Sequence, residues 1–202
     1  MPVVLAVISA ILLIILILLL RSILSEKKVR DEKHLIKTLK NRVLMDPLTS
    51  GQNKSAFSEY LHTIQKRMDA GRKIEFAIGI FDCNDLKKIN DEYGHDKGDI
   101  YLKSTCRLIC NVFQRSQVFR IGGDEFAVVL QNEDYDEREH LIQVFEDRSI
   151  DICASVENKW EEVRVASGIA VYDPQTDSST EDVAKRADGL MYEDKRRQKI
   201  KD

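Results

Sequence analysis

The chain has 202 residues, of which 43% are hydrophobic, and a formal net charge of −3, which allows one ordinary globular domain and an additional segment. The near-neutral charge argues against nucleic-acid binding, which needs a strongly basic surface. The four cysteines form no C-x-x-C pair and have no histidine at metal-ligand spacing, so we expect reduced and mostly packed thiols.

An uncharged run, VVLAVISAILLIILILLL, covers residues 3–20 and is long enough to cross a bilayer as a helix. Only Met1 and Pro2 precede this run and Arg21 follows it, so an uncleaved anchor over residues 1–21 is favoured over a cleavable signal peptide. The basic residues after the run place that side in the cytoplasm by the positive-inside rule. We therefore predict a single-pass protein of the inner (cell) membrane with a cytoplasmic catalytic domain.

A highly charged segment, residues 22–45, follows without internal glycine or proline and is predicted to be a helix. Val29, Ile36 and Val43 recur every seven residues, a short heptad pattern consistent with a parallel coiled coil between two protomers. A lone charged helix is the alternative, because so few heptads are weak evidence. The residue before Pro47 is pushed out of the α region, which ends this helix, so the globular domain is assigned to residues 46–202.

The domain reads as an alternation of helices and strands. An amphipathic helix over residues 53–71, with Gly71 as its stop, precedes a strand over 74–81, a short helix over 85–94 and a helix over 99–114. Strands at 117–121 and 126–130, a helix at 135–147, a strand at 163–173 and a closing helix at 180–200 complete it. From residue 74 the order is β-α-β-β-α-β, the ferredoxin-like or palm-type pattern of an α+β fold, an antiparallel sheet with helices on one face.

The stretch RIGGDEF, residues 120–126, interrupts a run of β-formers with two glycines and two carboxylates. Paired glycines allow the positive φ angles of a tight turn, so we expect a hairpin with an acidic tip. Because the first strand neighbours this hairpin, Asp82 can lie at the same sheet edge as Asp124 and Glu125. Three crowded carboxylates repel one another unless a cation shares them, and Mg²⁺ with phosphate oxygens fits such a site.

Metal-assisted nucleotidyl transfer is therefore the chemistry that these residues favour on their own. An acidic turn beside an unrelated aspartate is the alternative at this point. RIGGDEF and FDCNDLKKINDEYGHDKGD, together with DPLTSGQNKSAF, VASGIAVY and ADGLMYEDKRR, resemble the GGDEF family, the diguanylate cyclases. The resemblance covers residues 46–199, with five blocks in order.

The resemblance implies that two GTP molecules are joined into cyclic di-GMP with release of two pyrophosphates. Each domain would hold one GTP, so the enzyme would act as a homodimer. A degenerate GTP-binding module that regulates a partner is the rival, although the turn has lost none of its acids. A cyclic di-GMP receptor is a third possibility.

A set of metal and catalytic residues is implied in the same way. Asp82 and Asp124 match the metal-binding carboxylates, with the backbone carbonyl of Cys83 as a further ligand. Glu125 matches the neighbouring acid required for catalysis, which contacts the metal or helps to deprotonate the attacking 3′-hydroxyl. Phe81 would lie next to the nucleotide or in the core. The cofactor implied is Mg²⁺ or Mn²⁺.

Substrate contacts also follow from the resemblance. Asn90 and Asp99 match the pair that reads guanine, since Asp accepts from the guanine N1 and N2 donors while Asn supplies a donor. Lys87 and Lys195 match lysines that contact phosphate. The backbone amides of Leu86 and Lys87, which open a short helix, would also cradle phosphate.

The sequence departs from the family pattern at three places. The usual LTGLxNR reads LTSGQNK, next to Asp46 and with Asn53 retained, where the matching residues have a structural role. The usual KxxGRN reads KRRQK from Lys195. Phe113 and Ser116 replace the R-x-x-D pair of members with product inhibition, so we predict that this chain has no product-inhibition site. Arg120 is given no role.

Overall fold

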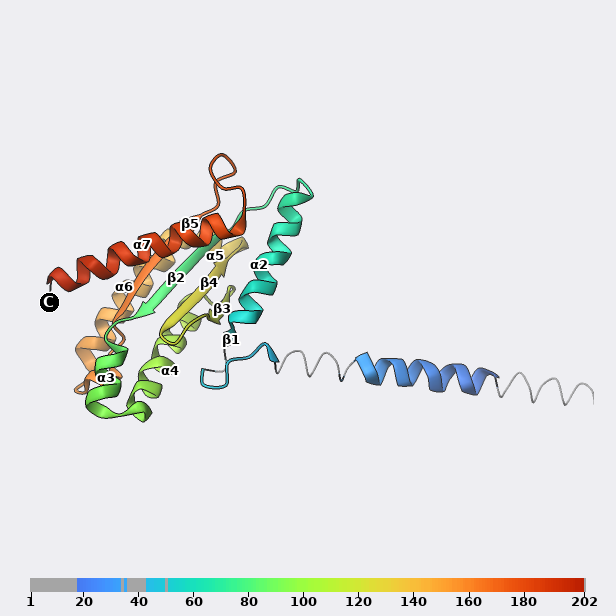
Figure 1. Cartoon of the computed structure of the whole chain (residues 1–202), viewed down its shortest axis with the longest axis horizontal. Helices are drawn as coiled ribbons and strands as arrows, with labels where there is room; N and C mark the ends of the chain where they lie inside the picture. The colour runs from blue at the N-terminus through green and yellow to red at the C-terminus, as the bar shows by residue number, and fades with distance from the viewer. Residues whose placement is uncertain (1–17, 34, 36–42, 50, 202) are drawn as a thin grey trace, which may run out of the picture. The chain divides into compact units, whose positions relative to one another are not determined.

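The computed structural model describes residues 18–33, 35, 43–49 and 51–201 (Figure 1). The chain divides into two compact units, residues 1–43 and 44–202. Residues 18–33 and 35 are helical, with exposed apolar side chains that include Ile23 and Leu24. In the described part of the chain, no helix has both the length and the apolar character needed to cross a membrane. The predicted span lies mostly outside the described residues.

The second unit contains a five-stranded sheet in the order β1-β3-β4-β2-β5. Its strands are β1 (Gln52–Asn53), β2 (Ala77–Cys83), β3 (Gln117–Arg120), β4 (Glu125–Leu130) and β5 (Val165–Val171). The α+β class and the adjacency of the first predicted strand and the hairpin are confirmed, because β2 pairs antiparallel with both β4 and β5. The sheet is not purely antiparallel as predicted, because the short strand β1 pairs parallel with β3.

The helices cover both faces of the sheet, which corrects the prediction that they lie on one face (Figure 1). One core lies between the sheet and α3 (Leu86–Tyr93), α4 (His95–Val112) and α6 (Arg138–Ser155). The other lies between the sheet and α2 (Lys54–Asp69) and α7 (Thr180–Lys201). The remaining helices are short, α5 (Asn132–Asp136) and the 3₁₀ turn η1 (Lys159–Glu161). Every residue of β2 is buried, as expected for a strand at the centre of two layers.

Local signals in the sequence explain several helix boundaries. The Asn53 side chain accepts a hydrogen bond from the Ala56 N–H, which caps α2, and Gly71 follows its end with φ of 66°. Gly94, with φ of 87°, separates α3 from α4. The loop after β2 and the first turn of α3 follow directly on the end of that strand.

Candidate active site

The acidic residues of the predicted site lie at one edge of the sheet. Asp82 is paired with Glu125 in the β2–β4 register, and the Cys83 N–H donates to the backbone carbonyl of Asp124 at 2.9 Å. The strand register therefore brings the end of β2 to the tip of the hairpin. This is the juxtaposition that the strand order predicts.

The Gly-Gly turn is built differently from the prediction, because neither Gly122 nor Gly123 has a positive φ. The space beside Gly122 is limited by the Glu125 side chain. A β-carbon there would lie 2.6 Å from Oε2 of Glu125, so a side chain would displace this carboxylate. A β-carbon on Gly123 would have no atom within 4 Å, so its backbone is open to approach by a ligand.

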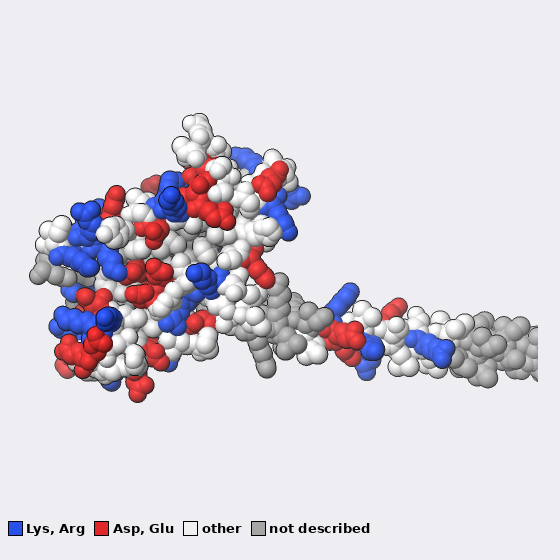
Figure 2. Space-filling view, in the orientation of Figure 1, with Lys and Arg blue, Asp and Glu red and all other residues white. Residues whose placement is uncertain are grey.

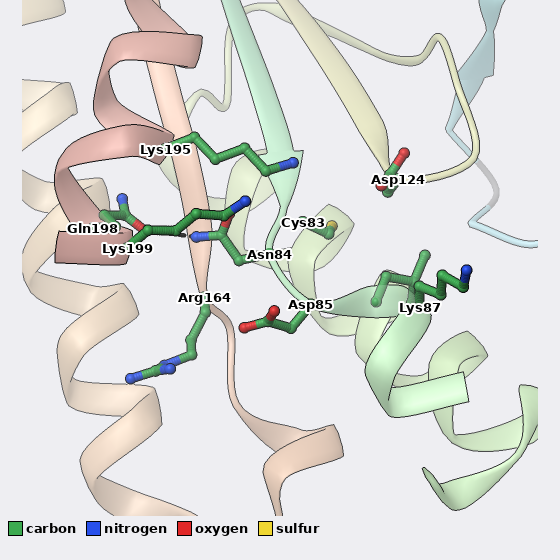
Figure 3. Close-up of a pocket in the computed structure, with 10 residues that line it drawn as sticks. Cys83, Asn84, Asp85, Lys87, Asp124, Arg164, Lys195, Gln198 and Lys199 are labelled. Carbon is green, nitrogen blue, oxygen red and sulfur yellow. Dashed lines mark hydrogen bonds between the residues drawn. The ribbon is translucent and has the colours of Figure 1, made fainter. Parts of the chain in front are cut away.

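An open pocket of about 380 Å³ adjoins this edge (Figure 3). The loop after β2, the first turn of α3, the hairpin tip, the start of β5 and the last turns of α7 form its wall. The lining residues are Cys83, Asn84, Asp85, Leu86, Lys87, Asp124, Arg164, Lys195, Gln198 and Lys199. Five of the predicted site residues therefore share one cavity, namely Cys83, Leu86, Lys87, Asp124 and Lys195.

Lys195 reaches from α7 to the end of β2, where its Nζ lies 2.5 Å from Oδ1 of Asp82 (Figure 3). Burial raises the pKa of Asp82, the Lys195 hydrogen bond and charge oppose that rise, and the charge of Asp124 adds to it. Burial, followed by the charges of Asp124 and Asp82, also raises the pKa of Glu125. The edge therefore carries an excess of negative charge that a cation would relieve.

The carboxylates do not form a closed metal cage. Among the described residues, no group of three or more His, Cys, Asp and Glu side chains could hold a metal ion. The predicted trio of Asp82, Asp124 and Glu125 is therefore looser than the sequence suggested. Mg²⁺ usually takes one or two protein carboxylates and fills its shell with phosphate oxygens and water, so these hard oxygen donors fit that ion.

The predicted guanine-reading residues lie away from this pocket. Asn90 on α3 packs against the first turn of α4, where a β-carbon on Gly98 would lie 1.9 Å from Oδ1 of Asn90. Asp99 is the next residue of α4 after Gly98. Phe81 is buried in the core, with its ring centroid 5.0 Å from that of Phe145, and does not line the pocket.

Comparison with known proteins identifies the family. A family model described as "Diguanylate cyclase, GGDEF domain" matches residues 43–201. The chain belongs to the GGDEF family. An uncharacterized membrane protein of Staphylococcus aureus is 31% identical over 110 residues, which are 54% of this chain and 31% of that relative. The match thus spans about a third of the length of the curated relatives.

Solved structures share the fold. The coiled coil and GGDEF domain of DgcB from Caulobacter crescentus, in complex with c-di-GMP, has a TM-score of 0.70 at 22% identity, over 85% of this chain and 91% of that chain. Diguanylate cyclase SiaD from Pseudomonas aeruginosa, in complex with its activator SiaC, has a TM-score of 0.69 at 22% identity, over 86% and 66%. At this identity, the likeness establishes a common architecture.

Arg120 of the GGDEF signature has a clear role that the sequence did not reveal. Its Nη2 donates to the Gly123 carbonyl at 2.7 Å, and its Nη1 lies 3.3 Å from Oδ1 of Asp46. Asp46 also accepts from the N–H and hydroxyl of Thr49, each at 2.8 Å. Arg120 therefore joins the acidic turn to the loop at which the domain begins.

The positions of the absent R-x-x-D pair are used for packing. Phe113 is buried beside Phe81 and Phe145. The Ser116 hydroxyl donates to Oδ2 of Asp134 at 2.7 Å, and the Arg115 N–H donates to the same oxygen at 3.1 Å. An acidic side chain thus ties the α4–β3 loop to α5.

Proposed function

We propose that this chain is a diguanylate cyclase, which condenses two GTP into cyclic di-GMP and two pyrophosphates by attack of a 3′-hydroxyl on an α-phosphate across a homodimer. The observation that carries the proposal is the pocket itself, which combines Asp124, Lys195 and the first turn of α3 beside Asp82 and Glu125. Carboxylates for a cation and donors for phosphate are the groups that nucleotidyl transfer needs.

The phosphate-binding part of the proposal rests on backbone donors at the start of α3 and on the lysines of α7. Asp85, which precedes α3, makes no side-chain capping bond, so the amides of Leu86 and Lys87 are available to an anion. Lys195 and Lys199 line the same cavity. On the face in Figure 2, Lys and Arg gather near the end of α7 beside a group of acidic side chains.

The acidic part is assigned to the metal and the proton. We propose that Mg²⁺ or Mn²⁺ is held by Asp82, Asp124 and the Cys83 carbonyl. The bound ion would neutralise negative charge at the phosphates. GGDEF diguanylate cyclases in general depend on a divalent metal. Glu125 is proposed to contact the metal or to accept the proton of the attacking hydroxyl, and either role needs its ionised form. Asn90 on α3 and Asp99 on α4 are proposed to read guanine.

Dimerisation and membrane attachment are further parts of the proposal. Two domains, each with one GTP, have to face one another, and holding the reactants together is a large catalytic term. In the described helix over residues 18–33, exposed Ile23, Leu24 and Val29 offer apolar side chains to a second helix. We also propose an anchor over residues 1–21 with a cytoplasmic domain; the curated relatives are called membrane proteins, which supports attachment to a membrane.

A GTP-binding module without catalysis is the second candidate. The tight Asp82–Lys195 pair favours it, because a metal must compete with the ammonium for that carboxylate. If Lys195 binds a phosphate of GTP instead, the Asp82 carboxylate is released from the ion pair and can bind the metal. The ion pair is in this way compatible with catalysis.

Product analysis decides between the two candidates. The full-length chain is incubated with GTP and Mg²⁺, and nucleotides are separated by chromatography and identified by mass, with Asp124→Ala as the control. The proposal predicts cyclic di-GMP from the wild type and about a hundredfold less from the variant, a factor that corresponds to about 2.7 kcal/mol of barrier. GTP binding without any cyclic product from a dimeric wild type would establish the second candidate.

A further inference from the structure

Gln198 on α7 makes a contact with the loop after β2 that the family pattern does not anticipate, since a glycine usually occupies its position in KxxGRN. The Asn84 side-chain amide donates to Oε1 of Gln198 at 2.6 Å. Asn84 follows Asp82 by two residues, and both Asn84 and Gln198 line the pocket (Figure 3). The contact joins segments that lie 114 residues apart in the sequence.

The orientation of both amides is fixed by a chain of hydrogen bonds that begins at Asp194. Oδ2 of Asp194 accepts from the Ser167 N–H at 3.0 Å and from Nε2 of Gln198 at 2.8 Å. Nε2 of Gln198 also donates to the Val165 carbonyl at 3.2 Å. Because both partners of this nitrogen are acceptors, the oxygen Oε1 has to face the other way, toward Asn84.

Asn84 must then present its nitrogen to Gln198 and its oxygen to the opposite side. Oδ1 of Asn84 is buried and has no hydrogen-bond partner among the described residues. The backbone of Asn84 is fixed as well, since its N–H donates to the Arg164 carbonyl at 2.9 Å and its carbonyl accepts from the Tyr101 hydroxyl at 3.0 Å. Asn84 is thus held at both its backbone and its side chain.

The same bonds hold the last turns of α7 against the pocket. Gln198 lies one turn after Lys195 and directly before Lys199, and both lysines line the cavity. Long lysine side chains have many rotamers, so their arrival at a phosphate depends on where the helix presents them. The hydrogen bonds of Gln198 to β5 and to Asn84 fix the position of the last turns of α7, where a helix end is otherwise expected to fray. They therefore fix where the two lysine side chains start.

We propose that Gln198 is a positioning residue for nucleotide binding, which acts through the Asp194–Gln198–Asn84 chain to place the loop after β2 and the two pocket lysines. The inference rests on the proposed function, because it assigns these lysines to GTP phosphates. It adds that this chain places them with an amide at a position where the family usually has glycine.

The test measures the affinity of the full-length chain for a fluorescent GTP analogue with Mg²⁺, together with the melting temperature. Gln198→Ala removes three hydrogen bonds and is expected to weaken binding about tenfold, which corresponds to about 1.4 kcal/mol. In Asn84→Asp, a carboxylate oxygen replaces the amide nitrogen that donates to Oε1 of Gln198, so two acceptors face each other. If the Gln198 amide flips, its oxygen then faces the Asp194 carboxylate, which is again a contact between two acceptors. A similar loss is therefore expected.

Rescue separates the hydrogen-bond chain from general damage. In Asn84→Asp/Gln198→Lys, the introduced ammonium can donate to the new carboxylate, to Asp194 and to the Val165 carbonyl, so binding should return to within about threefold of the wild type, a gap of about 0.7 kcal/mol. Asn84→Asp/Glu193→Gln carries the same net charge through an exposed position on α7 and should show no rescue. Glu193→Gln alone should bind like the wild type.

The outcomes are distinguishable. Wild-type affinity in Gln198→Ala, or equal affinity in the two double variants, overturns the positioning role and leaves the proposed function standing. No GTP binding by a folded wild type contradicts the proposed function and this inference with it. A raised dissociation constant in a Gln198→Ala variant that still unfolds cooperatively is the result that we expect.

Discussion

The link from Arg120 to the acidic turn gives a sharp prediction. Arg120→Ala removes the 2.7 Å hydrogen bond to the Gly123 carbonyl and the ion pair with Asp46. Both side chains are mostly buried, with 16% of Arg120 and 14% of Asp46 exposed. The turn that carries Asp124 then loses its tie to the start of the domain.

The size of the effect follows from these contacts. A hydrogen bond from a charged donor contributes about 1.5–3 kcal/mol, and a partly exposed ion pair contributes up to about 1 kcal/mol. Asp46 keeps its two bonds from Thr49, so it is not left without partners. We expect Arg120→Ala to lower the free energy of unfolding by about 3 kcal/mol, which is roughly 6–12 °C in melting temperature for a domain of this size.

Urea denaturation of the wild type, Arg120→Ala, Asp46→Ala and the double variant measures this coupling. The losses in free energy of unfolding of the two single variants should add up to about 1 kcal/mol more than the loss of the double variant, because the ion pair is counted twice in the sum. Arg120→Lys should retain part of the stability, because one ammonium cannot serve both partners as the planar guanidinium does. An unchanged urea midpoint in Arg120→Ala, or strictly additive single effects, would refute the reasoning.

Three further predictions concern the turn and its acids. Gly122→Ala should lower the rate of cyclic di-GMP formation about tenfold, or about 1.4 kcal/mol of barrier, because its β-carbon would displace the Glu125 carboxylate. Gly123→Ala should have the melting temperature of the wild type. Equal rates for the wild type and Gly122→Ala would disprove the first expectation. Since burial and the charges of Asp124 and Asp82 raise the pKa of Glu125 in the fold, the contribution of this carboxyl to the stability of the metal-free protein should fall as pH rises from about 4.3 to its raised folded pKa. Glu125→Gln should lack this part of the pH dependence of the melting temperature. Calorimetry on Asp124→Ala should detect no high-affinity binding of cyclic di-GMP, because the R-x-x-D pair is missing. Tight binding would contradict the prediction that this chain has no product-inhibition site.

The parts of the fold that were predictable are those with local signals. The Asn53 cap, the stop at Gly71 and the hairpin around the two glycines each lie within a few residues of the boundary that they set. The adjacency of Asp82 and Glu125 also followed, because strand order alone brings β2 beside β4. The helices on both faces were missed although β2 carries their signal, because a continuous apolar run is typical of a strand buried on both sides.

The missed features depend on contacts between distant residues. Arg120 and Asp46 are 74 residues apart, and Asn84 and Gln198 are 114 apart, so no local pattern points from one to the other. The positive φ expected of the two glycines was wrong: neither has one, and only Gly122 lies against a side chain, that of Glu125. The conformation of a turn depends on the side chains that pack on it, and in this turn the Glu125 side chain packs against Gly122.

The central claim is that two copies of this chain join two GTP molecules, and the concentration dependence of the product tests it most directly. The initial rate of cyclic di-GMP and pyrophosphate formation is measured against the concentration of the full-length chain with saturating GTP and Mg²⁺. The proposed function predicts two pyrophosphates for each cyclic di-GMP and a rate that rises faster than linearly until the dimer is saturated. GTP that stays intact, or yields only a linear product at a rate proportional to protein, would contradict it.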